Sequence, residues 1–243
     1  PSHIALHAYA FPYDPIHQTF VNVYEDSALM LQLILDANRQ DAEYYSGTTQ
    51  GRLAVVRTFV ASGIEHILIG PDHILFLIGL LLLGGTLARL ALIVTSFTIG
   101  HSITLSLVTF GLLPPVGGWI EPIIAATIGL GGALAYAGKA STRTMLLVPL
   151  TFGLVHGLGF AAALTDKLAE WRHGQVVQVL IGFNLGVELA QMLVIFGVAG
   201  LLWTYTRLRS DDRPVRRALG AAVALIGFGV MAWRLWELLT GEA

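Results

Sequence analysis

The 243-residue sequence contains no cysteine and few charged residues. Without cysteine there is no disulfide framework, no thiolate metal site and no cysteine nucleophile. Only 12% of the residues are charged and 55% are hydrophobic, whereas a soluble domain carries about twice that charged share. The formal net charge of -2 provides no basic surface for nucleic acid, so no such partner is expected. The composition therefore predicts a protein embedded in a lipid bilayer.

Six long apolar stretches support this prediction. A helix needs about 20 apolar residues to cross a bilayer, and the stretches lie at about 58–83, 88–113, 118–138, 143–165, 176–205 and 215–239. Their runs of Leu, Ile, Val, Ala and Gly do not alternate with polar residues, as the strands of a membrane barrel do. The sequence predicts an all-α integral membrane protein with about six transmembrane helices in a domain spanning residues 58–243.

Residues 1–57 have a different pattern. "HIALHAYAF" and "TFVNVYE" alternate with the period of a half-buried strand, and "ALMLQLIL" is a third strand candidate. Two or three strands are marginally stable alone. We therefore expect a small β-rich segment outside the membrane that packs on the helices or belongs to a larger outer domain.

The loop charges predict the orientation of the helices. Basic residues follow the first, third and fifth predicted helices, at Arg89, at Lys139 and Arg143, and five times within 207–217. The loop "LLPPVGG" has no basic residue, and residues 166–173 balance two basic with two acidic ones. Arg-rich loops stay in the cytoplasm. Both termini are therefore expected to be extracytoplasmic, in an inner membrane of the bacterial type.

Ionisable and amide side chains interrupt the apolar helices. A charge at membrane depth costs at least about 2.5–3.5 kcal/mol, so it normally faces the bundle interior and serves a function. At about 1.5 Å per residue, groups on four of the helices lie about 10–22 Å from the outer end. The candidate metal ligands are His66, Asp72, His73, His101, His156 and Glu188, and the candidate pathway or supporting residues are Glu65, Glu121, Asn184 and Gln191.

Imidazoles and carboxylates without thiolates suit a divalent transition metal, and Ni, Co or Zn is the expected ion. His66 and His73 lie two helical turns apart on nearly one face, and Gly70 and Pro71 between them can kink the helix. Asp72 either ligates the ion or orients a histidine. A single intramembrane histidine can instead bond to a neighbouring helix.

The remaining polar residues leave two roles open. Asn184 and Gln191 either line a path or bond to neighbouring helices, and Glu65 and Glu121 either form an outer mouth or stabilise helix ends. Glu188 is a ligand or a proton acceptor.

Several motifs carry a family resemblance. "HILIGPDHILF", with His66, Asp72 and His73, resembles the H-x5-D-H signature of the HupE/UreJ family of nickel and cobalt permeases. "FGLVHGLGFA", around His156, resembles its second signature. "TSFTIGHSITLSL" and "FNLGVELAQ" are similar to the branch with an extracytoplasmic N-terminal domain. The resemblance implies metal uptake through this site.

Three functions remain open from the sequence. The first is transport of a divalent metal ion, with the bilayer and the ion as partners and a homo-oligomer possible. The second is an intramembrane zinc-dependent hydrolase, because three histidines and a carboxylate can also hold a catalytic zinc. The third is a metal sensor or metal-delivery protein. The apolar run "ILFLIGLLLLGG" after His73 argues against a continuous path unless it is a closed inner gate.

Overall fold

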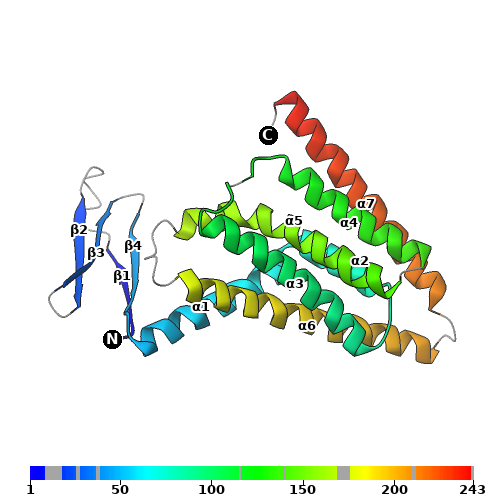
Figure 1. The fold of residues 1–243 in the computed structure, drawn as a ribbon, viewed down its shortest axis with the longest axis horizontal. Helices are drawn as coiled ribbons and strands as arrows, with labels where there is room; N and C mark the ends of the chain where they lie inside the picture. Colours follow the sequence, from blue (N-terminus) through cyan, green and yellow to red (C-terminus); the bar gives the residue numbers. More distant parts are fainter. Residues whose placement is uncertain are drawn as a thin grey trace. The chain divides into compact units, whose positions relative to one another are not determined.

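The computed structural model describes residues 1–8, 18–25, 28–36, 39–114, 116–138, 141–168, 176–208 and 212–241. Two compact units follow each other along the chain, Pro1–Thr58 and Phe59–Ala243. The first contains the strands, and the second contains most of the helices (Figure 1).

The first unit contains two antiparallel strand pairs. β1 (His3–His7) pairs with β4 (Asp41–Tyr45), and β2 (Thr19–Glu25) pairs with β3 (Ala28–Leu35). The three predicted strands are confirmed, although residues 9–11 of the first lie outside the described ranges. β4 was not predicted, because the polar residues of "DAEYY" hide its alternation: Ala42 and Tyr44 are buried, and their neighbours Asp41 and Glu43 are exposed.

Within the described ranges, five helices are each long and apolar enough to cross a membrane. They are α3 (Leu87–Thr109), α4 (Ile120–Ala137), α5 (Thr142–Leu168), α6 (Val176–Leu208) and α7 (Arg213–Thr240). A sixth span arises if α1 (Thr49–Ile69) and α2 (Pro71–Leu81) are counted together. The chain is thus an all-α integral membrane protein with a small strand segment, as predicted. Of the loops used for orientation, residues 139–140, 169–175 and 209–211 lie outside the described ranges.

The first predicted membrane helix is broken. α1 starts at Thr49, before the predicted 58, and α2 leaves it at an angle of 74°. Gly70 is extended (φ -72°, ψ 105°) and Pro71 opens α2. Proline lacks a backbone N–H and its ring disfavours a helical residue before it, so the chain stops one helix and starts another. The kink expected at Gly70 and Pro71 is therefore a full break.

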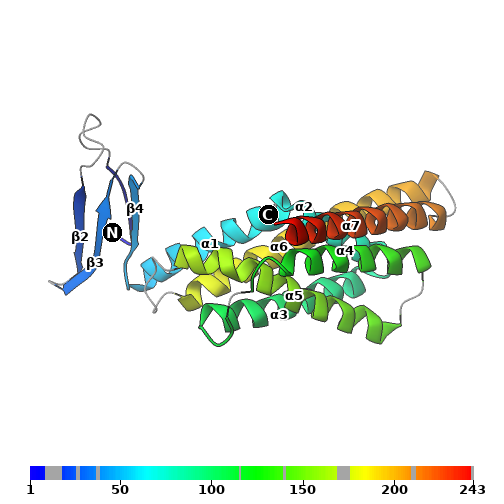
Figure 2. The same ribbon diagram turned by 90° about the horizontal axis from the view of Figure 1, so that it is seen from above.

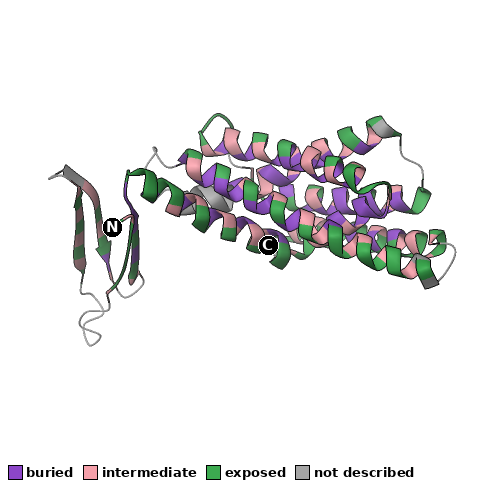
Figure 3. Cartoon of the chain, turned by 90° about the horizontal axis from the view of Figure 1, so that it is seen from below, coloured by how far each residue is buried: buried purple, intermediate pink, exposed green. Residues whose placement is uncertain are grey.

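The transmembrane helices carry exposed residues along their outer sides and buried residues between the helices (Figure 3). On α6, Ile181, Leu185, Leu189 and Leu193 recur about every four residues and are exposed, whereas Phe183 is fully buried. Exposed aliphatic stripes of this kind suit lipid. The two ends of the bundle are called below the Glu121 end, where α4 begins, and the Arg216 end, where α7 begins.

The interior near the Arg216 end is apolar. Phe76, Leu80, Ile93, Val94 and Ile195 belong to one buried cluster. Arg216 joins α7 to the end of α2, since its guanidinium donates to the Leu82 carbonyl at 3.2 Å. The same guanidinium pairs with Asp212 at 2.6 Å. Two rings of this cluster, Phe76 and Phe97, border the His156 ring.

Candidate metal centre

Four histidines from four helices gather in the interior of the bundle. They are His66 on α1, His73 on α2, His101 on α3 and His156 on α5. Ring centroids lie 4.3 Å apart for His66 and His73, 5.6 Å for His73 and His156, and 6.4 Å for His66 and His101. Residues separated by up to 90 positions in the sequence thus form one histidine cluster.

The break between α1 and α2 brings the first two rings together. In a straight helix, residues seven apart would be about 10 Å apart along the axis. The 74° bend reduces the distance between the rings of His66 and His73 to 4.3 Å. A Cβ on Gly70 would lie 2.6 Å from His73 Nδ1, so only glycine leaves room for that ring. The Gly-Pro pair therefore shapes the centre itself.

Glycines place the other two rings through the contact between α3 and α5, which lie side by side in both views (Figures 1 and 2). A Cβ on Gly100 would collide with the Leu150 carbonyl, and one on Gly153 would collide with the Phe97 carbonyl. This close backbone approach buries His101 and His156, which are 1% and 2% exposed.

Three histidines of the cluster each have one buried nitrogen without a hydrogen-bond partner among the described residues. His156 Nε2 lies 2.8 Å from the Thr127 hydroxyl on α4. The Nδ1 atoms of His73, His101 and His156 are buried without a hydrogen bond. Buried polar atoms are nearly always paired, so unpaired ones in a native interior need an explanation such as a ligand. In the tautomer with the proton on Nε2, three such Nδ1 atoms offer lone pairs of the kind that transition metals bind.

Phenylalanine rings enclose the cluster on two sides. Phe160 and Phe183 stack at 4.6 Å, and Phe160 lies 4.1 Å from the His66 ring. Phe76 and Phe97 lie 4.9 Å and 5.2 Å from His156 and belong to the apolar cluster. Sequence reasoning did not place these rings, although Phe97 lies one helical turn before His101 on α3.

The predicted residues on α6 bond to α3. Asn184 Oδ1 accepts from the Ser102 hydroxyl at 2.6 Å, and Gln191 Oε1 accepts from Thr98 at 2.8 Å. Glu188 accepts from Thr95. Of the two roles left open for Asn184 and Gln191, bonding to a neighbouring helix is thus observed.

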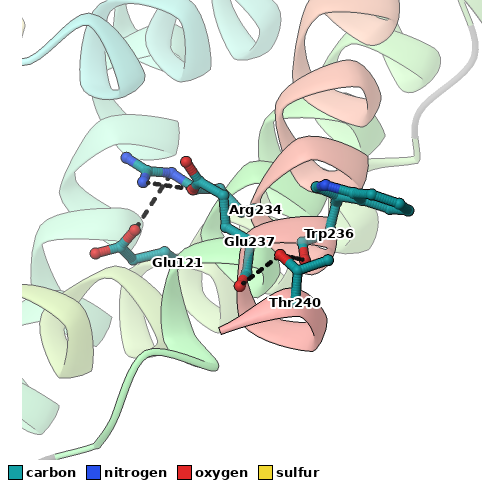
Figure 4. Close-up of polar contacts among 5 residues, drawn as sticks. All are labelled: Glu121, Arg234, Trp236, Glu237 and Thr240. Carbon is teal, nitrogen blue, oxygen red and sulfur yellow. Dashed lines mark hydrogen bonds and ion pairs between the residues drawn. The ribbon is translucent and has the colours of Figure 1, made fainter. Parts of the chain in front are cut away.

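Three predicted acidic residues are exposed: Glu65 on α1, Asp72 in the first turn of α2, and Glu121 at the start of α4. Asp72 sits where a carboxylate favours a helix N-terminus. Glu121 pairs with Arg234 of α7 at 3.3 Å. Figure 4 shows that Arg234 also reaches Glu237, at 3.1 Å, beside the Thr240 hydroxyl that bonds the Trp236 carbonyl. The Glu121 carboxylate therefore ties α4 to α7.

The sequence profile described as HupE / UreJ protein matches residues 42–237. The chain belongs to the HupE/UreJ family. No curated protein and no solved structure matches it. The family match confirms the resemblance carried by the histidine motifs. It supports a membrane protein related to metal transport, with the lipid bilayer and a metal ion as partners. It also supports a location in the inner membrane.

The ring positions differ from a closed metal site. Among the described residues, no three His, Asp or Glu side chains are placed so that they could hold one ion. The nearest rings, those of His66 and His73, are tilted edge to face at 61°. Their atoms are close, but their nitrogens do not converge on one point.

Proposed function

We propose that this HupE/UreJ protein carries a divalent transition-metal ion, nickel or cobalt, across the membrane through the histidine cluster. The observation that supports the proposal best is the convergence of four imidazoles from α1, α2, α3 and α5 within ring distances of 4.3–6.4 Å. A purely structural core gains nothing from burying so many polar rings, because each loses hydration.

The ring spacing suits shared coordination. An imidazole nitrogen binds a transition metal at about 2 Å, so rings that share an ion have centroids on the order of 5 Å apart. His73 and His156, at 5.6 Å, are close to that spacing. Rotation about the side-chain bonds then turns nitrogens toward the ion without moving the helices. Thr127, bonded to His156 Nε2, fixes which nitrogen of that ring is left for the metal.

We infer that the Arg216 end faces the cytoplasm and the Glu121 end faces outward, since Arg89, Arg216 and Arg217 lie at the former. The absence of cysteine allows a clean test. In intact cells, a membrane-impermeant maleimide should label Leu112→Cys, an exposed residue before α4. It should leave Arg217→Cys unlabelled. The reverse pattern would invert the orientation.

Nickel and cobalt binding and flux test the function itself. Purified protein should bind the ion, and proteoliposomes should accumulate it. His73→Ala and His156→Ala should each lower affinity by at least about 100-fold, since even the groups that support a ligand are worth 10–100-fold. His7→Ala is the matched control, because His7 is exposed in β1 and pairs with Asp41 at 2.7 Å. Metal retained by both variants would refute the site, and bound zinc without flux would favour the hydrolase.

Acid should weaken metal binding. Imidazole must be neutral to donate a lone pair, so protons compete with the ion as the pH falls through the range in which histidine titrates. Nickel binding measured by calorimetry from pH 8 to about pH 5 should show a steady loss of affinity. Affinity that stays constant would contradict proton competition for the imidazole nitrogens over this range.

A further inference from the structure

The bonds between α3 and α6 form a polar ladder of three rungs. Its hydroxyls are Ser102, Thr98 and Thr95, and its acceptors are Asn184, Gln191 and Glu188. In each rung an α3 hydroxyl donates to an oxygen on α6. All six side chains offer oxygen atoms, whereas the histidine cluster offers nitrogens.

Two atoms of the ladder are buried and unpaired. Glu188 Oε2 and Gln191 Nε2 have no hydrogen-bond partner among the residues that the structure describes, and Gln191 is fully buried. A carboxylate oxygen left bare in an apolar interior is costly. Neither atom is needed to hold α3 to α6, because Glu188 Oε1 and Gln191 Oε1 already make those bonds.

The ladder extends away from the histidines toward the Arg216 end. Ser102 neighbours His101, but Thr95 precedes His101 by six residues, about 9 Å along the helix. Through its bond to Thr95, the Glu188 carboxylate contacts α3 at that level, on the Arg216 side of His101. The corresponding stretch of α2, from Ile74 to Leu81, has only apolar residues.

A pocket of about 200 Å³ opens at the Arg216 end, lined on α6 by Val198, Leu202 and Trp203. Its first lining residue on α6, Val198, lies seven residues, or about 10 Å of helix, after Gln191. The ladder and this pocket thus occupy successive levels of α6. Between them, Ile195 is buried in the apolar cluster.

We propose that the ladder is a second, weaker cation-binding station, centred on Glu188 and supported by Thr95, Thr98 and Gln191, which receives the ion from the histidine cluster. This inference rests on the proposed transport function. One carboxylate with neutral oxygens binds a nickel or cobalt ion less tightly than several imidazoles. Conduction needs such a step, because an ion held only at its tightest site does not leave. The apolar layer around Ile195 is then the closed gate between the station and the pocket.

Glu188→Gln provides the decisive variant, because it removes the charge and keeps an oxygen to accept the Thr95 bond. Nickel influx into proteoliposomes should fall at least about tenfold. Tight nickel binding to the solubilised protein should stay within about threefold of the parent, because the imidazoles remain. A weaker second equivalent of nickel, present in the parent, should disappear.

Thr95→Val tests the same station without touching a charge and should also slow influx. Thr151→Val is its matched control, because the Thr151 hydroxyl on α5 bonds only carbonyls of its own helix, those of Leu147 and Val148. Normal influx in Glu188→Gln would overturn the station and leave the transport function standing. A loss of tight binding in that variant would place Glu188 among the histidine ligands instead. A parent that neither binds nor accumulates nickel would refute both proposals.

Discussion

Two helix pairs of the bundle are built in the same way and used differently. α3 packs on α5 through Gly100 and Gly153, and α4 packs on α7 through Gly132 and Gly227. In each pair, a Cβ on either glycine would strike the backbone of the partner helix. Small residues that let backbones approach are the usual means of helix association in lipid.

The difference between the pairs lies beside those glycines. His101 follows Gly100 and His156 lies three residues after Gly153, whereas α7 carries no ionisable residue between Arg217 and Arg234. Close packing alone therefore does not indicate a functional site. In the α3–α5 pair it fixes two polar rings in the interior, and in the α4–α7 pair it contributes stability.

Gly153→Val, in the α3–α5 pair, should have the largest effect on stability and on nickel binding. The new side chain would collide with the Phe97 carbonyl and press on His101 N, 2.9 Å from the Cβ position. We expect a loss of about 3 kcal/mol in stability from overpacking, together with loss of nickel binding because His101 and His156 move apart. Thermal unfolding in detergent and nickel titration measure the two effects. Normal binding in this variant would show that the α3–α5 contact does not position the rings.

Gly227→Val should break the second pair without affecting the first. Its side chain would collide with the backbone of Gly129, at a cost of about 2 kcal/mol. Nickel affinity of the folded fraction should fall by no more than about tenfold, because α4 and α7 carry no histidine of the cluster and α4 reaches it through the Thr127–His156 bond. Unfolding and titration on the same preparation provide the measurement. A matching loss of affinity would mean that the two pairs are coupled.

Thr127→Val tests the link between the two helix pairs, because Thr127 lies on α4 and bonds His156 on α5. Removal of this hydroxyl should lower nickel affinity about tenfold, or about 1.4 kcal/mol, as expected for a group that orients a ligand. Calorimetric titration measures the change, with Thr151→Val as the control. Unchanged affinity would assign Thr127 to packing alone.

Glu121→Gln should have the smallest effect on stability. The ion pair with Arg234 lies at the surface of the bundle, with side chains 56% and 40% exposed. Such pairs contribute less than about 1 kcal/mol. A double-mutant cycle with Arg234→Gln, read by thermal unfolding, would isolate the pair. A coupling well above that value would show that the α4–α7 contact depends on charge as well as on glycine.

Local sequence patterns predicted much of this molecule. Apolar run lengths identified the spans from α3 to α7, alternation identified β1 and β2, and the apolar run "ALMLQLIL" was the candidate for β3. β4 was missed, because alternation is weak in a strand of five residues with two charges. The sequence also predicted that polar groups on different helices would share a layer, since lipid penalises a charge that faces outward.

What the sequence determined by itself is the membrane class, the histidine motifs and the weak point at Gly70 and Pro71. Each follows from local chemistry: apolar length, the cost of burying charge, and the missing N–H of proline. Only the tertiary structure decided that the break brings His66 and His73 to 4.3 Å, that Thr127 supports His156, and that Glu188 belongs to the α3–α6 ladder. These depend on the bend angle and on which helices become neighbours, and no single helix encodes either.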